Sequence, residues 1–191
     1  MFEIALPDLD EQALIAQAQC GDRQAFGELV RRYQQGVVNV VYRMCGEASL
    51  AEEAAQEAFI RAWQNLPRYN PHFAFRSWVY RIALNVALDV LRSERQTSDL
   101  ADLSPLEQPL APETDEPEAA MERKERAALV QRAVLALAPA SRSVLILREY
   151  EGMSYQEMSA ALDIPIGTVM SRLNYARSQV RQTLSKVLEV A

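Results

Sequence analysis

The sequence has few of the residues that build metal centres or disulfide frameworks. It contains two cysteines, Cys20 and Cys45, and one histidine, His72, among 191 residues. This set cannot supply the four nitrogen and sulfur ligands of a structural zinc site, and a secreted disulfide scaffold would need more cysteines. We therefore expect a reduced cytoplasmic protein without a metal, in which both cysteines pack as small apolar residues near helix ends.

Long apolar runs are also missing. No stretch approaches the roughly 18 consecutive apolar residues of a membrane helix, and the first residues lack a basic segment followed by an apolar one. Neither membrane insertion nor targeting is expected. The sequence also lacks a glycine-rich phosphate loop and a nucleophile with a usable base, so we expect no enzyme and no cofactor.

Positive charge is in deficit overall, with a net charge of −6, which at first argues against a nucleic-acid partner. The deficit is local, however. Residues 94–126 carry 10 acids and 4 bases, whereas residues 127–191 carry 5 acids and 7 bases. Residues 59–93 hold five arginines and one acid, Asp89. Two mildly basic regions therefore flank an acidic segment.

Apolar periodicity predicts an all-α protein with two small domains. Residues 10–93 and 123–188 keep apolar side chains at helical spacing, as at Phe26, Leu29, Val30 and Tyr33. Residues 94–122 contain four prolines and few large apolar residues, which is typical of a flexible linker. No internal repeat and no strand-like alternation competes with this interpretation.

Within the first domain, Gly21 followed by Asp22 predicts the end of one helix and the N-cap of the next. Ser49 with Glu52 predicts a capping box that opens a further helix. On that helix an acidic face is formed at i, i+3, i+4 and i+7 by Glu53, Gln56, Glu57 and Ile60. Such a face suits docking on a basic protein surface, although plain solubility is the common alternative.

Residues 68–81 interleave five aromatic side chains with three arginines and no acid. This pattern suits single-stranded nucleic acid, because bases stack on rings while cations follow the backbone. The competing explanation is a helix core, which is the more common role for Phe75, Trp78 and Ile82 at helical spacing. The proline-bounded loop predicts exposure of Tyr69, His72 and Phe73.

Residues 154–181 predict a helix-turn-helix. Ser154 and Glu157 form a capping box, residues 163–167 supply a break, and a second helix follows. Its buried stripe is Val169, Leu173, Ala176 and Val180, which leaves Met170, Ser171, Asn174 and Tyr175 on another face. A second helix of this kind enters the DNA major groove, although a plain helical hairpin with solvated arginines is the alternative.

Four segments together resemble bacterial extracytoplasmic-function sigma factors of the sigma-70 family. They are LAEEAAQEAFIRAW (50–63), FRSWVYRIALN (75–85), LREYEGMSYQE (147–157) and GTVMSR (167–172). The resemblance implies a sigma-2-like domain at 10–93 and a sigma-4-like domain at 123–188, joined by the acidic linker at 94–122. It also implies three partners: the core RNA polymerase with its beta-prime clamp and beta flap, promoter DNA in duplex and single-stranded form, and an anti-sigma factor.

The resemblance assigns expected roles to residues of both domains. The polymerase-binding residues are expected to be Glu53, Gln56, Glu57 and Ile60. The minus 10 element is expected to contact Arg68, Tyr69, Asn70, His72, Arg76, Trp78 and Asn85. The minus 35 element is expected to contact Arg148, Thr168, Met170, Ser171, Arg172, Asn174, Tyr175 and Arg177.

One departure from the family pattern concerns the minus 35 contact. Several relatives carry arginine where this chain has Met170, so bidentate recognition of guanine is missing there. The preferred minus 35 sequence is therefore expected to differ. The alternative function is a dimeric helix-turn-helix regulator that binds duplex DNA without replacing a sigma factor.

Overall fold

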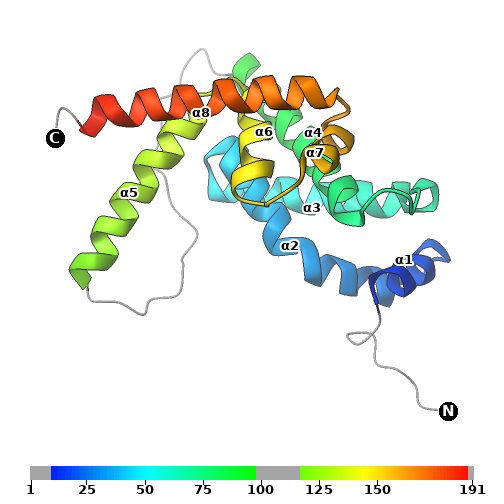
Figure 1. Ribbon diagram of the computed structural model, residues 1–191. Helices are drawn as coiled ribbons and strands as arrows, with labels where there is room; N and C mark the ends of the chain where they lie inside the picture. Colours follow the sequence, from blue (N-terminus) through cyan, green and yellow to red (C-terminus); the bar gives the residue numbers. More distant parts are fainter. Residues whose placement is uncertain (1–9, 98–116, 189–191) are drawn as a thin grey trace.

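The computed structural model describes residues 10–97 and 117–188, and the regular structure in both ranges is helical (Figure 1). The first unit consists of α1 (Glu11–Gln19), α2 (Arg23–Cys45), α3 (Ala48–Asn65), the 3-10 helix η2 (Leu66–Arg68) and α4 (Phe75–Thr97). The second unit consists of α5 (Pro117–Leu135), α6 (Pro139–Glu149), α7 (Tyr155–Leu162) and α8 (Ile166–Leu188). The predicted all-α class with two helical units is confirmed.

The boundary between α1 and α2 follows the predicted cap. The Asp22 carboxylate accepts hydrogen bonds from the amides of Gln24 at 2.8 Å and Ala25 at 3.1 Å, which satisfies two donors of the first turn. Gly21 precedes it with φ 95°, a left-handed conformation that costs a glycine little. At its other end α2 stops at Gly46, which is also left-handed, with φ 88°.

The predicted capping box at the start of α3 is wrong. The helix begins at Ala48, the N-cap position is Glu47, and no side chain caps the first turn. Ser49 therefore lies inside the helix, where its hydroxyl donates to the Glu47 carboxylate at 2.6 Å. Because Ala48 is a strong helix former, the helix begins two residues before the start that the Ser49 signal indicated.

The buried face of α3 is made of alanines, and this lets the helix pack closely against both α2 and α4. Small side chains allow helix axes to approach, and any longer side chain there would need space that the core does not have. The buried residues of α3 are Ala51, Ala54, Ala55, Ala58 and Ala62. The outer face of α3 is consequently the part of this helix that can meet a partner.

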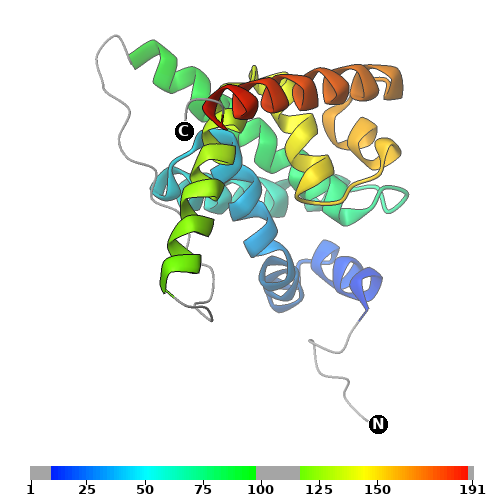
Figure 2. The same cartoon turned by 60° about the vertical axis from the view of Figure 1, so that its left-hand side comes forward.

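The two units pack directly on one another, and their buried apolar residues form one continuous cluster. Figures 1 and 2 show α6 and α7 lying against α2 and α4, with α8 running along the outside. The buried Arg142 of α6 donates to the carbonyl of Met44 in the last turn of α2. It also donates to the carbonyl of Leu135, and to that of Leu137 at 2.9 Å. One guanidinium thus joins the C-terminal end of α2 to the α5–α6 connection.

Two further contacts lie at the same boundary between the two units, here called the seam. The Leu135 side chain covers Gly46, so that a β-carbon at this glycine would overlap it. Arg43 of α2 lies over the ring of Tyr150, with its guanidinium carbon 4.0 Å from the ring centroid, which is a cation–π geometry. The end of α2 is therefore covered by the second unit.

Two boundary predictions differ from the structure. Helix α4 continues to Thr97 and α5 begins at Pro117, so the predicted linker at 94–122 includes residues of both helices. The rest of that linker, residues 98–116, lies outside the described residues. Cys20 was expected in the core but is exposed at the C-cap of α1, whereas Cys45 is partly buried against the core as expected.

The alanine face of α3 gives a direct test of this packing. Ala58→Leu adds three carbon atoms at a fully buried position, and we expect it to lower the free energy of unfolding by about 1–3 kcal/mol. Urea unfolding followed by circular dichroism measures the change. Gln64→Leu on the exposed side of α3 is the matched control and should change the free energy by less than about 0.5 kcal/mol. Equal effects of the two substitutions would contradict the close packing.

Candidate nucleic-acid and polymerase interface

The loop between η2 and α4 is held in place by a side chain from α1. Gln19 donates through its amide to the carbonyl of Leu66 at 3.1 Å and to that of Tyr69 at 3.0 Å. Within the loop, the His72 amide donates to the Asn70 side chain at 3.0 Å. These bonds fix a surface loop whose backbone would otherwise have several conformations. Gln19 was not predicted, since its partners lie some fifty residues away and no local pattern marks it.

Tyr69 supports this loop from within and does not project from it. Its side chain is 6% exposed, its hydroxyl donates to the Phe73 carbonyl, and its burial raises the pKa of the phenol. The ring lies 5.0 Å from that of Trp78 and 5.6 Å from that of Phe75, between centroids. The predicted exposure of Tyr69 is therefore wrong, because an aromatic cluster at the start of α4 buries the ring.

The neighbouring residues of the loop are exposed as predicted. Phe73 is 53% exposed, and Arg68, Asn70 and His72 are also on the surface. Trp78 is half-buried in the aromatic cluster, so only part of its ring can meet a ligand. The loop thus presents a ring, an imidazole and a guanidinium side by side, which is a composition suited to unpaired bases and phosphates.

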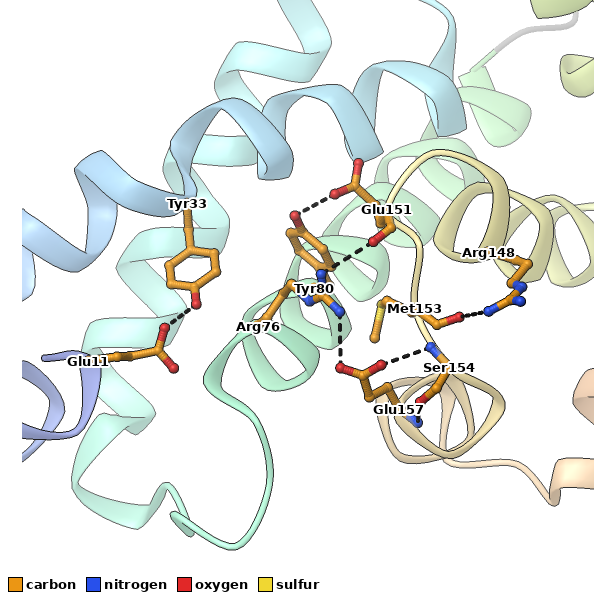
Figure 3. Close-up of polar contacts among 9 residues, drawn as sticks. All are labelled: Glu11, Tyr33, Arg76, Tyr80, Arg148, Glu151, Met153, Ser154 and Glu157. Carbon is orange, nitrogen blue, oxygen red and sulfur yellow. Dashed lines mark hydrogen bonds and ion pairs between the residues drawn. The ribbon is translucent and has the colours of Figure 1, made fainter.

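Helix α4 carries Arg76 and Asn85 beyond this loop. Asn85 is exposed. Arg76 is half-buried, because its guanidinium is bound by the second unit through Glu157 at 3.0 Å (Figure 3). Asn85 is therefore accessible on the surface of α4, whereas Arg76 is held in an ion pair.

The predicted acidic face of α3 is present on the surface. Glu53 and Gln56 are exposed, and Ile60, a large apolar side chain, is 52% exposed. Glu57 is partly buried and pairs with Arg61 at 2.7 Å. The face formed by Glu53, Gln56, Glu57 and Ile60, here called the α3 face, combines acids with one apolar side chain at its C-terminal end.

The helix-turn-helix forms with the predicted caps. The Ser154 hydroxyl accepts from the Glu157 amide at 3.2 Å, and the Glu157 carboxylate accepts from the Ser154 amide at 2.8 Å. The Ser154 amide, its hydroxyl and the Arg76 guanidinium together hold the pKa of Glu157 below its usual range. Asp163 ends α7 in the left-handed conformation, with φ 55°, and α8 begins three residues later.

Helix α8 presents the predicted residues on its outer side. Met170 is 46% exposed and Tyr175 is 55% exposed, while Ser171 and Asn174 are exposed between them. Of the predicted stripe, Val169, Leu173 and Ala176 are buried, and Val180 is partly buried against the core. We call Met170, Ser171, Asn174 and Tyr175 the α8 reading face; these side chains point outward at a spacing that can follow base edges.

The other residues predicted to contact the minus 35 element are either bound to other parts of the protein or partly buried. Arg148 donates to the Met153 carbonyl at 2.8 Å and lies near the Tyr155 ring, so it holds the turn before α7. Arg177 pairs with Glu149 of α6 at 2.5 Å. Thr168 and Arg172 are partly buried. Arg148 and Arg177 thus contribute to the structure of the second unit in addition to any contact that they make with DNA.

Over the described ranges, 10–97 and 117–188, no group of three or more histidine, cysteine or acidic side chains is placed to hold a metal ion. None of the helices in this part of the chain is both long and apolar enough to cross a membrane.

Comparison with known proteins identifies the family. Residues 29–97 match the family model of sigma-70 region 2, and residues 127–180 match that of sigma-70 region 4. The chain is 35% identical to the RNA polymerase sigma-H factor of Pseudomonas aeruginosa over 188 residues, covering 95% of this chain and 97% of that one. It is 34% identical to the ECF RNA polymerase sigma-E factor of Escherichia coli K12 over 178 residues, covering 90% and 93%.

Solved structures agree with this assignment. The structure of CnrH in complex with the cytosolic domain of CnrY superposes with a TM-score of 0.70 at 27% identity, covering 92% of this chain and 97% of that one. The sigma factor RpoE of Bartonella quintana, in complex with the anti-sigma factor NepR, has the same fold, with a TM-score of 0.69 at 20% identity over 84% of this chain and 96% of that one. The chain belongs to the extracytoplasmic-function group of the sigma-70 family of RNA polymerase sigma factors.

Mutation can distinguish the loop residue that supports the fold, Tyr69, from one that lies on the surface, His72. Tyr69→Ala removes a buried ring and is expected to lower the free energy of unfolding by about 3–5 kcal/mol, whereas Tyr69→Phe removes only the hydroxyl bond and should cost about 1 kcal/mol. His72→Ala at an exposed position should cost less than about 0.5 kcal/mol. Thermal and urea unfolding provide the comparison. A Tyr69→Ala protein as stable as the His72→Ala protein would show that the ring is not part of the core.

Proposed function

We propose that this sigma factor binds core RNA polymerase through the α3 face, holds the minus 10 element with the η2–α4 loop and α4, and reads the minus 35 element with α8. The observation that carries the proposal is the exposure of these three surfaces on two units that match sigma-70 regions 2 and 4 in that order. In this role the protein is not itself an enzyme. It supplies promoter selection and strand opening to a polymerase in the cytoplasm.

The α3 face is suited to a basic, partly apolar surface on the polymerase. Its acids steer association with a positive partner, and the exposed Ile60 supplies apolar area beside them. The beta-prime clamp is the proposed partner of this face, and the beta flap that of the second unit.

The η2–α4 loop is suited to strand opening. The exposed ring of Phe73 and the imidazole of His72 provide stacking surfaces for unpaired bases, while Arg68 follows the phosphates. Asn85 offers a donor and an acceptor that can recognise a base edge. Melting is then differential binding, because contacts to the single strand compensate for the loss of base stacking.

The α8 reading face is suited to the major groove. Ser171 and Asn174 provide hydrogen bonds, and the exposed thioether of Met170 can contact a thymine methyl group. A guanidinium at that position would instead favour guanine. We therefore propose a minus 35 element in which the base opposite Met170 is thymine in place of guanine.

Both elements can be reached only with the two units apart. Promoter elements about twenty base pairs apart are separated by roughly 60–70 Å at 3.4 Å per pair. The connection between Thr97 and Pro117 has a fully extended limit on the order of 65 Å. It can bridge such a distance only near its limit, so the polymerase must hold the two units in place.

An anti-sigma factor is a further proposed partner. CnrH and RpoE of Bartonella quintana were both solved in complex with a second protein, in the latter case an anti-sigma factor. We propose that this chain is regulated in the same manner. The alternative of a dimeric helix-turn-helix regulator is not favoured, because it has no use for a region 2 domain.

Transcription with core polymerase tests the proposal. Core enzyme with the protein should give new transcripts from genomic DNA, and mapping their 5′ ends should reveal one shared upstream pair of elements. Core enzyme alone is the control. Identical transcripts in both reactions, or tight palindromic DNA binding by the protein without polymerase, would exclude the sigma function.

Asn85 gives a sharper test at the promoter. Asn85→Ala removes a hydrogen-bonding side chain from the exposed face of α4, and we expect permanganate reactivity of the opened strand to fall about three- to tenfold. Asp89→Ala lies one helical turn further along α4 and is the control, with less than about a twofold effect. Normal opening with Asn85→Ala would remove this residue from the minus 10 contact.

A further inference from the structure

We propose that Gln19 is a positioning residue for strand opening, through which α1 holds the η2–α4 loop in the conformation that receives the unpaired minus 10 strand. The inference rests on the proposed function and deepens it, because this loop is the element proposed to hold that strand. The segment that matches sigma-70 region 2 begins at residue 29, so α1 precedes it in the chain. The proposal therefore adds a helix to the proposed minus 10 site.

The side-chain amide of Gln19 binds both ends of η2. Its nitrogen donates to the Leu66 carbonyl at 3.1 Å and to the Tyr69 carbonyl at 3.0 Å. A primary amide has two hydrogens, so each carbonyl can receive one of them. Leu66 is the first residue of η2, and Tyr69 is the residue that follows its end. Gln19 therefore fixes the direction in which the chain leaves η2 and enters the loop.

Tyr69 extends this restraint to the far end of the loop. Its hydroxyl donates to the Phe73 carbonyl, and its ring packs against that of Phe75, the first residue of α4. Between these ends, the Phe73 amide donates to the Asn70 carbonyl at 3.2 Å. The exposed side chains of Asn70, His72 and Phe73 are thus presented by a segment that is anchored on both sides.

A second contact joins α1 to the other side of the same loop. The Tyr33 hydroxyl of α2 donates to the carboxylate of Glu11, in the first turn of α1 (Figure 3). The Tyr33 ring lies 5.4 Å from the Phe75 ring, between centroids. Helix α1 is therefore connected to the start of the loop through Gln19, and to its end through Tyr33 and Phe75.

The position of Gln19 is itself fixed. Leu14, Ile15 and Ala18 are buried in the core along one side of α1, and the Gly21 amide donates to the Ala18 carbonyl at 3.0 Å in the turn that follows. A helix of nine residues is marginal in water by itself, so its order depends on this packing. The two hydrogen bonds therefore come from a rigid support, as a positioning role requires.

A loop held in one conformation binds the opened strand with a smaller loss of conformational entropy. When only a fraction of the molecules has the competent loop, the apparent affinity falls by that fraction. Without the two donors of Gln19, we expect the loop to occupy several conformations. Affinity for the unpaired strand should then fall, whereas the α3 face and the α8 reading face should be unchanged.

Two substitutions at Gln19 remove the donors while nearly keeping the size of the side chain. Gln19→Met has a similar length and no amide, and Gln19→Glu has the same shape but turns a carboxylate toward two carbonyl oxygens. Gln17→Met and Gln17→Glu are the matched controls, because Gln17 is exposed on the same helix. The second control also corrects for the effect of an added negative charge on DNA binding. Circular dichroism and urea unfolding check the fold of each protein.

Holoenzyme assembled from core polymerase and each variant is titrated with a single-stranded oligonucleotide, which carries the minus 10 sequence of a promoter defined by transcript mapping. The dissociation constant should rise about three- to tenfold with Gln19→Met, and at least as much with Gln19→Glu. It should stay within about twofold for both Gln17 controls. The affinity of every variant for core polymerase should also stay within about twofold.

Amide hydrogen exchange of the free protein locates the change in the structure. Exchange at Tyr69 and Phe73 should accelerate in the Gln19 variants, because both amides bond within the restrained segment. The buried turns of α2 should exchange at the wild-type rate. A general loss of stability would instead accelerate both regions.

Two results would overturn the positioning role. One is an unchanged strand affinity in the Gln19→Met holoenzyme, and the other is an equal fall in strand affinity and in core affinity, which would show that Gln19 only supports the fold. Either result leaves the proposed function standing, because the wild-type holoenzyme still binds the strand. A wild-type holoenzyme that binds no minus 10 strand would instead reject the function.

Discussion

The buried guanidinium of Arg142 is the contact on which the arrangement of the two units depends. It donates to carbonyls at the C-terminal ends of α2 and α5 and in the connection that follows α5. Carbonyls at helix ends carry partial negative charge and have no partner within their own helix, so a buried cation is stabilised there. If the units separate, the bond to Met44 is lost while those to Leu135 and Leu137 remain within the second unit. Arg142 therefore keeps two of its hydrogen-bond partners in either arrangement, whereas its bond to the first unit exists only while the units are packed together.

The apolar seam and Arg142 bring α6 against α2, and this places α7 beside α4, where the acids meet the cations. The polar contacts alone would be weak, because ion pairs near solvent contribute little. The apolar packing holds them in register, so that Arg76 and Arg81 are paired with Glu157 and Asp163 in this arrangement. In the proposed complex with polymerase the two units lie at separate docking sites, and these pairs are then lost.

Local features of the fold could be predicted from the sequence, whereas contacts between distant segments could not. The Asp22 cap, the Ser154–Glu157 box and the outward face of α8 follow from spacing along one helix. Tyr69 was predicted to be exposed, but it is buried by rings that α4 contributes. Ser49 was predicted to be an N-cap, but the helix already begins at Ala48, a strong helix former. The partner of Arg76 lies 81 residues away, so no periodicity indicates that pair. The roles of the site residues toward polymerase and DNA stay predictions.

The central claim is that polymerase, and not DNA, separates the two units. Fluorescence energy transfer between dyes at residues 24 and 182 tests it in one titration. Transfer should be high in the free protein, stay high when promoter DNA is added alone, and fall when core polymerase is added. Unchanged transfer in a complex with core polymerase that is active in transcription, or a fall on adding DNA alone, would contradict the account.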